Sequence, residues 1–86
     1  MKLTRKENCY EVESNGYFYR IEKAEDQKAY KGLYEIQVTK NGRSEWLISL
    51  WSLKQVRGSI ENGDVATEYE GLCECIDNGS IYDNFD

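Results

Sequence analysis

The chain has 86 residues, of which 40% are hydrophobic and 31% are charged, and its net charge is −5. This composition excludes a disordered chain, and 86 residues supply one hydrophobic core, so we expect a single domain over residues 1–86. No stretch approaches the about 18 consecutive apolar residues of a membrane span, and residues 1–6 lead into polar sequence without an apolar signal segment. We therefore expect a cytoplasmic protein without a membrane partner.

The first half of the chain carries two hairpin signals. Asn-Gly pairs occur at residues 15–16 and 41–42, each after a run in which apolar and polar residues alternate. Asn-Gly favours a two-residue hairpin turn because both positions adopt positive φ. The first hairpin is predicted near residues 8–14 and 17–23. The second joins the alternating run before Asn41 to residues 46–51. That last run is apolar on both faces, so it is predicted to be the most buried strand, covered on each side.

A helix is predicted to begin after this run. Residues 52–55, Ser-Leu-Lys-Gln, have the form of a capping box, in which the Ser52 hydroxyl accepts from an early helical N–H and Gln55 reaches back. The Asn-Gly pair at residues 62–63 is a typical helix end. The side chains predicted to pack on the sheet are Leu53, Val56 and Ile60.

A second helix follows from a second capping box, Thr67-Glu68-Tyr69-Glu70, and it is predicted to end at the Asn-Gly pair of residues 78–79. Its apolar stripe consists of Tyr69, Leu72, Cys73 and Ile76. The predicted fold is therefore α+β: a four-stranded antiparallel sheet of two hairpins followed by two short C-terminal helices, in the order ββββαα. Residues 1–51 form the sheet portion and residues 52–86 the acidic helical C-terminal portion.

Charge is divided unevenly along the chain. Residues 1–60 hold all eleven Lys and Arg residues together with eight acids, whereas residues 61–86 hold eight acids and no base. In the second predicted helix, Glu70, Glu74 and Asp77 recur at i, i+4 and i+7 and form an acidic stripe beside the apolar one. Like charges at i, i+4 destabilise a helix by about 0.2–0.5 kcal/mol per pair, so a helix chosen for stability alone would include bases.

The acidic C-terminal portion is interpreted as a surface for a basic partner protein. A protein groove that binds a nucleic-acid backbone would be attracted to these carboxylates by the same electrostatics, and nearby aromatic side chains would supply apolar anchors. The candidate partner-binding residues are Glu61, Asp64, Glu68, Tyr69, Glu70, Glu74, Asp77, Tyr82, Asp83, Phe85 and Asp86. The sequence leaves one alternative open, in which the acidic face serves only solubility.

Catalysis is not favoured, because the chain has no histidine, the commonest general base. Glu11 and Glu13 share one side of a predicted strand at a separation that glycosidases use, but two solvated residues on an outer strand face are the simpler interpretation. Cys9, Cys73 and Cys75 are an odd set, which predicts reduced thiols. Without histidine they predict no zinc site, and no phosphate-binding glycine loop is present, so we expect no metal and no cofactor.

Three features of residues 33–86 carry a resemblance to a known group of proteins. They are a hairpin turning at Asn41-Gly42, a helix after Trp51-Ser52, and an acidic tail with tyrosines, as in residues 68–70 and 82–86. In this layout the chain resembles small phage-encoded anti-CRISPR and other anti-defence inhibitor proteins. The resemblance implies a non-enzymatic inhibitor in the host cytoplasm that occludes the target-DNA site of a nuclease by acting as a DNA mimic.

A second hypothesis is a small nucleic-acid-binding module with an acidic regulatory tail. Aromatic side chains of the sheet would stack on bases while basic side chains meet the backbone. The aromatic candidates are Tyr17, Phe18, Tyr19 and either Trp46 or Trp51, and the basic candidates are Arg20, Lys23, Lys28, Lys31, Lys40 and Arg43. This hypothesis ranks second, because the bases are interleaved with glutamates and aromatic residues in alternating strands usually form the core.

Overall fold

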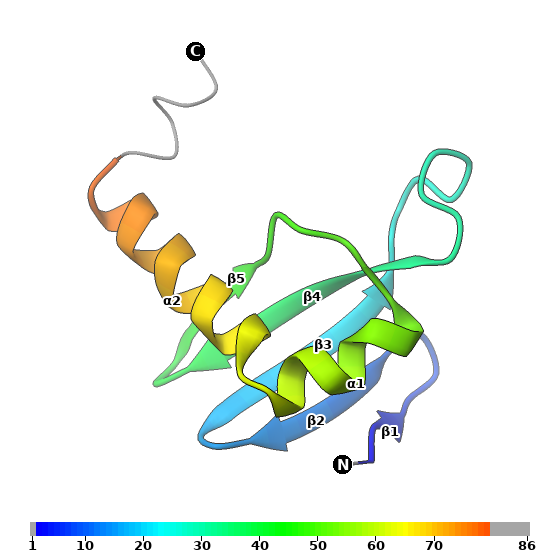
Figure 1. Cartoon of the computed structure of the whole chain (residues 1–86), viewed down its shortest axis with the longest axis horizontal. Helices are drawn as coiled ribbons and strands as arrows, with labels where there is room; N and C mark the ends of the chain where they lie inside the picture. Colours follow the sequence, from blue (N-terminus) through cyan, green and yellow to red (C-terminus); the bar gives the residue numbers. More distant parts are fainter. Residues whose placement is uncertain (1, 80–86) are drawn as a thin grey trace.

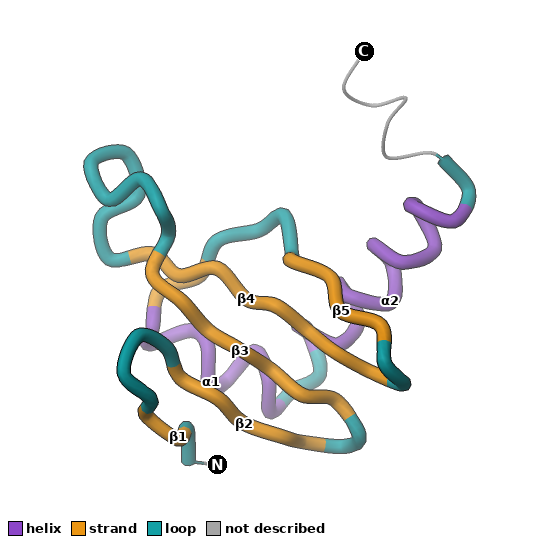
Figure 2. The backbone as a smooth tube through the Cα atoms, turned by 180° about the vertical axis from the view of Figure 1, so that it is seen from behind, coloured by secondary structure: helices purple, strands orange, loops and turns teal. Residues whose placement is uncertain are grey.

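The computed structural model describes residues 2–79, which form two layers: an antiparallel sheet and two helices that both lie on one face of it (Figures 1 and 2). The strands are β1 (Thr4–Arg5), β2 (Tyr10–Ser14), β3 (Tyr17–Lys23), β4 (Leu33–Lys40), β5 (Arg43–Trp46) and β6 (Trp51–Ser52). The helices are α1 (Leu53–Glu61) and α2 (Asp64–Asp77). The α+β class, with an antiparallel sheet followed by two C-terminal helices, is therefore confirmed.

Both predicted hairpins form around their Asn-Gly pairs. Asn15 and Gly16 join β2 to β3 with φ values of 53° and 85°. Asn41 and Gly42 join β4 to β5 with φ values of 52° and 80°. Positive φ at both central residues is the turn geometry whose twist matches that of the flanking strands, and Asn and Gly adopt it at low cost.

The sheet has more strands than the four that were predicted. Its order is β1-β2-β3-β4-β5, and β6 pairs with β4 beyond the end of β5. Both additional strands contain only two residues, with Thr4 opposite Glu11 in β1 and Trp51 opposite Tyr34 in β6. Two residues are too few for an alternating pattern to stand out, so only pairing with a neighbour defines these strands.

The prediction of one fully buried strand over residues 46–51 was wrong. β5 ends at Trp46, whose side chain is 43% exposed, and only Leu47 of the next four residues is buried. The Leu47 N–H still bonds to the Ile36 carbonyl at 2.9 Å, but Ile48 is 61% exposed. A strand apolar on both faces needs a layer on each side, and here both helices lie on the same side (Figure 2).

The first helix begins as predicted and the second does not. Ser52 caps α1 by accepting from the Gln55 N–H, while the Gln55 side chain accepts from the Ser52 N–H, which completes the capping box. α2 begins at Asp64, one turn before the predicted Thr67 cap, because Gly63 at φ 88° lets the chain reverse and the Asn62 side chain accepts from the Asp64 N–H. Neither helix is long and apolar enough to cross a membrane.

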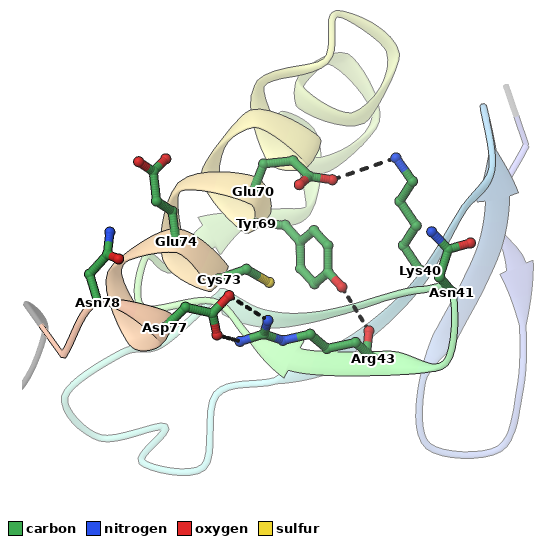
Figure 3. A pocket seen from close by; sticks show the side chains of 9 residues that line it. All are labelled: Lys40, Asn41, Arg43, Tyr69, Glu70, Cys73, Glu74, Asp77 and Asn78. Carbon is green, nitrogen blue, oxygen red and sulfur yellow. Dashed lines mark hydrogen bonds and ion pairs between the residues drawn. The ribbon is translucent and has the colours of Figure 1, made fainter.

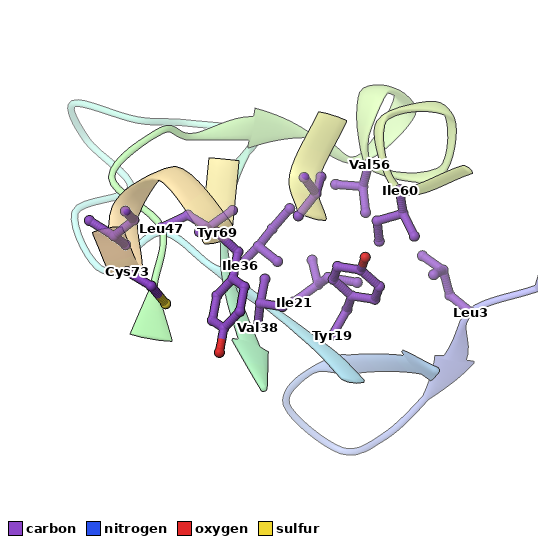
Figure 4. Packing of buried hydrophobic residues seen from close by; sticks show 12 residues of the cluster. Leu3, Tyr19, Ile21, Ile36, Val38, Leu47, Val56, Ile60, Tyr69 and Cys73 are labelled. Atoms are coloured by element: carbon purple, nitrogen blue, oxygen red, sulfur yellow. The ribbon is translucent and has the colours of Figure 1, made fainter. Parts of the chain in front are cut away.

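The hydrophobic core fills the space between the sheet and the helices (Figure 4). The strands contribute Tyr19, Ile21, Ile36 and Val38, α1 contributes Val56 and Ile60, and α2 contributes Val65, Tyr69, Leu72 and Cys73. These include five of the seven predicted stripe residues, and the other two, Leu53 and Ile76, are partly buried and pack against the core. The opposite face of the sheet, which we call the open face, has no helix over it within residues 2–79 (Figure 2).

Candidate functional site

The predicted acidic stripe lies on the flank of α2 that faces the hairpin of β4 and β5 (Figure 3). Its first carboxylate, Glu70, accepts a hydrogen bond from the Tyr17 hydroxyl at 2.9 Å. The Lys40 ammonium lies 3.6 Å from Glu70, bonds to the Tyr17 hydroxyl at 3.2 Å, and sits 4.4 Å from the centre of the Tyr17 ring. The hydrogen bond to Tyr17, more than the charge of Glu70, raises the pKa of Lys40. Glu70 is therefore held by the sheet.

The last carboxylate of the stripe is held by an arginine. Asp77 receives two bonds from the Arg43 guanidinium, at 3.1 and 3.0 Å, and Arg43 also donates to Glu45 at 3.1 Å. Bonds to Asp77 first and Glu45 second raise the pKa of Arg43, which is charged at any pH of interest. A bidentate pair of this kind fixes the geometry of both partners.

Tyr69, also on α2, is only 3% exposed. Its hydroxyl donates to the Arg43 carbonyl at 2.8 Å, and its ring contacts the Tyr17 ring edge-on with centroids 6.0 Å apart. Burial, and then the neighbouring Cys73, raise the pKa of Tyr69 to about 12. Tyr69 was predicted as an anchor for a partner, but its burial leaves it unavailable at the surface. Instead, its hydroxyl joins α2 to β5.

These contacts frame a groove of about 750 Å³ between α2 and the hairpin. Its lining residues are Lys40, Asn41, Arg43, Tyr69, Glu70, Cys73, Glu74, Asp77 and Asn78 (Figure 3). Two of the three stripe carboxylates are offset by Lys40 and Arg43, so the local charge of stripe plus bases is −1. The structure thus brings the stripe together as predicted, but most of its charge is balanced within the molecule.

The other predicted partner-binding residues fall into three groups. Glu61 and Asp64 are exposed at the junction of the helices, and Glu68 lies on the other flank of α2, where the Ser49 hydroxyl donates to it. Glu74 is exposed between Glu70 and Asp77. Tyr82, Asp83, Phe85 and Asp86 lie outside the residues that the structure describes.

A second acidic surface, outside the predicted acidic stripe, occupies the open face. Residues directly opposite in an antiparallel pair share a face, so the strand register decides which side chains lie there. One row across the strands is Glu11, Arg20, Gln37 and Trp46, the next is Glu13, Phe18, Thr39 and Ser44, and a third contains Glu22 and Glu35. Phe18 and Trp46 are 38% and 43% exposed.

The open face is therefore acidic with two exposed aromatic rings. Arg20 is the one base among the open-face residues of β2 to β5, and it bonds to Glu22 at 2.6 Å. This bond, ahead of the charges nearby, raises the pKa of Arg20. The sequence did hold a signal for this surface: Glu11, Glu13, Glu22 and Glu35 fall on one parity of their strands, opposite the apolar residues.

The nucleic-acid-binding hypothesis placed aromatic and basic side chains together, and the structure separates most of them. Tyr19 is buried, and Tyr17 and Trp51 pack against the core on the helix side. Lys40 and Arg43 also lie on that side, bound to Glu70 and Asp77. Only Phe18, Trp46 and Arg20 of the proposed binding residues share the open face, and a nucleic-acid backbone there would meet four glutamates.

No group of cysteines and carboxylates within residues 2–79 is arranged to hold a metal ion. Cys9 and Cys73 are buried, Cys75 is exposed, and all are free thiols. Comparisons with protein families, with curated proteins and with solved structures gave no match.

Proposed function

We propose that this protein is a small non-enzymatic inhibitor that binds a basic surface of another protein and covers a surface that its target uses for nucleic acid. The observation that carries the proposal is the composition of the open face, where four glutamates and one arginine surround two exposed aromatic rings. Carboxylates attract a surface lined with Lys and Arg as phosphates do, and the rings add the apolar contact that charges lack.

The acidic stripe of α2 has a supporting role in this proposal. Lys40 and Arg43 offset much of its charge, while Glu74 carries no internal ion pair among the described residues. We place the first contact with the target at the open face and a second, weaker contact at the exposed acids of α2. The resemblance to anti-defence inhibitors indicates the target class to test first, which is a nuclease that binds nucleic acid through a basic groove.

The test combines capture with a measurement of nucleic-acid binding. The intact protein, immobilised through its N-terminus, is exposed to a bacterial lysate at low and high salt, and captured proteins are assayed for oligonucleotide binding with and without added protein. One variant neutralises the open face (Glu11→Gln, Glu13→Gln, Glu35→Gln). A matched variant removes the same number of charges from α2 (Glu70→Gln, Glu74→Gln, Asp77→Asn).

The proposal predicts that a captured nucleic-acid-binding protein loses oligonucleotide binding in the presence of the intact protein, and that the open-face variant loses both capture and inhibition. The α2 variant should retain most of both. Loss in the α2 variant alone would overturn the assignment to the open face. Tight, salt-sensitive binding of oligonucleotides by the intact protein itself would overturn inhibition by charge mimicry and favour the nucleic-acid-binding module.

A further inference from the structure

The open face has a pattern more specific than its net charge, because each exposed ring lies beside a carboxylate. Phe18 is directly opposite Glu13, so their Cβ atoms are about 4.5–5.5 Å apart, and Glu11 is its diagonal neighbour at about 7–8 Å. Trp46 is opposite Gln37, which makes Glu35 its diagonal neighbour on β4. A cation that lies on either ring can therefore reach a carboxylate.

Three of the four glutamates on this face are available for such a cation. Glu22 is bound by Arg20, whereas Glu11, Glu13 and Glu35 form no ion pair within residues 2–79. The hairpin bases, Lys40 and Arg43, point to the helix side and are already paired with Glu70 and Asp77. Within residues 2–79, Glu13 and Glu35 therefore have no ion-pair partner, and Glu11 has only the longer-range charge of Arg20, which lies directly opposite it and bonds to Glu22.

The combination of ring and carboxylate favours arginine over lysine. A guanidinium is planar and weakly hydrated, so its face can stack on an aromatic ring while the N–H groups at its edge donate two parallel hydrogen bonds to a carboxylate. A lysine ammonium is a compact, strongly hydrated point charge that gains less from the ring. Arg20 gives an internal example of the carboxylate bond alone, since its guanidinium reaches Glu22 two residues along the same strand at 2.6 Å.

The spacing favours an extended ligand. Glu11 and Glu13 are two residues apart on β2, and such residues are separated by about 6.6–7 Å along a strand. Alternate side chains of an extended segment have the same separation, so arginines two positions apart can meet Glu11 and Glu13. Glu35 and Trp46 lie on β4 and β5, two and three strand spacings of about 4.8 Å from β2, so a segment that reaches them as well crosses the strands obliquely.

We infer that the open face binds an extended, arginine-rich segment of the target, with guanidinium groups stacked on Phe18 and Trp46 and bonded to Glu11, Glu13 and Glu35. This inference rests on the proposed function and narrows it, because any basic surface would satisfy the glutamates alone. It assigns the aromatic rings a direct role in choosing arginine.

The experiment uses the whole protein and three synthetic peptides of equal length, in which serine alternates with arginine, with lysine or with glutamine. Affinities are measured by calorimetry at low salt, and amide chemical shifts identify the strands that respond. The variants Phe18→Thr and Trp46→Thr remove one ring each, and threonine suits a strand position. Tyr30→Thr is the control, because Tyr30 is equally exposed, at 45%, but lies in the loop between β3 and β4.

The arginine peptide should bind more tightly than the lysine peptide, by up to about fivefold per stacked ring, which is the full value of an exposed cation–π contact. Phe18→Thr and Trp46→Thr should each remove that advantage in part, Tyr30→Thr should leave it unchanged, and shifts should concentrate in β2 to β5. Circular dichroism checks that each variant is folded.

The outcomes separate this inference from the broader proposal. Equal affinity for the arginine and lysine peptides, or equal losses in the ring variants and in Tyr30→Thr, would overturn the inference. If capture of a basic target still depended on the open-face glutamates, the proposed function would stand without it. Absence of both peptide binding and glutamate-dependent capture would overturn the two together.

Discussion

The hydroxyl of Tyr69 connects α2 to the sheet, and its removal should measurably loosen that connection. In Tyr69→Phe the buried ring remains, but the Arg43 carbonyl loses a donor at 2.8 Å. A neutral hydrogen bond of this kind contributes about 1 kcal/mol to the free energy of unfolding. The loss on substitution rises to about 2 kcal/mol when the remaining partner stays buried and unpaired. For a domain of this size, 1 kcal/mol corresponds to a Tm lower by about 4–8 °C.

Thermal and urea unfolding followed by circular dichroism measure this effect. Tyr30→Phe is the matched control, because Tyr30 is 45% exposed and its hydroxyl forms no hydrogen bond within residues 2–79, so its Tm should be unchanged. The slope of the urea transition should be the same in all three proteins, since the surface exposed on unfolding is the same. An unchanged Tm for Tyr69→Phe would refute the view that this hydroxyl fastens α2 to β5.

The same substitution has a pH signature. The pKa of Tyr69 is about 12 in the folded protein, raised from 10.0 mainly by burial, so the native state holds this proton more tightly than the unfolded chain. The associated stability is fully present below pH 10 and is lost as pH rises through 12. Because Tyr69→Phe has no hydroxyl to titrate, the difference in unfolding free energy between the parent protein and this variant should shrink between pH 10 and pH 12. A difference that stays constant across this interval would contradict the raised pKa.

Two further predictions concern backbone conformation and the ion pairs of α2. Gly58→Ala should raise the free energy of unfolding by about 0.5–1 kcal/mol, because Gly58 lies inside α1 with open space where a Cβ atom would be. Gly63→Ala should lower the free energy of unfolding by about 1–2 kcal/mol, because Gly63 has φ 88°. Chemical denaturation of both variants checks that the two effects have opposite signs. A double-mutant cycle of Arg43→Met and Asp77→Asn should give a small favourable coupling that falls with added salt, and a coupling indifferent to salt would exclude an electrostatic origin.

The molecule's charge is arranged differently from what linear order suggested. The chain divides into a first part that holds every base and a last part that holds only acids. In the folded protein, the hairpin bases Lys40 and Arg43 cross to α2 and offset Glu70 and Asp77. Within residues 2–79, Glu74 on α2 and also Glu13 and Glu35 on the sheet stay without an ion-pair partner, so part of the unpaired negative charge lies in the half of the chain whose net charge is positive. Net charge per segment is therefore a poor guide to where a partner would meet negative charge.

The sequence by itself determined the features that depend on neighbouring residues. Positive φ is accessible to Asn-Gly at residues 15–16 and 41–42, so both hairpin turns could be placed. The capping box at Ser52 and the apolar stripes of both helices likewise follow from interactions within three or four positions. Such contacts form with little loop-closure entropy, and a local pattern is enough to specify them.

Only the tertiary structure decided which carboxylates are paired and which surface stays uncovered. The Tyr17–Glu70 bond joins residues 53 positions apart, and the Arg43–Asp77 pair joins residues 34 apart. No local sequence pattern encodes these contacts, because they depend on which face of the sheet α2 packs against. One pair of short helices can cover only one face of the sheet. Because both helices pack on the same face, residues 46–51 lack a second covering layer, and the side chains of Glu11, Glu13, Phe18 and Trp46 lie on the uncovered face.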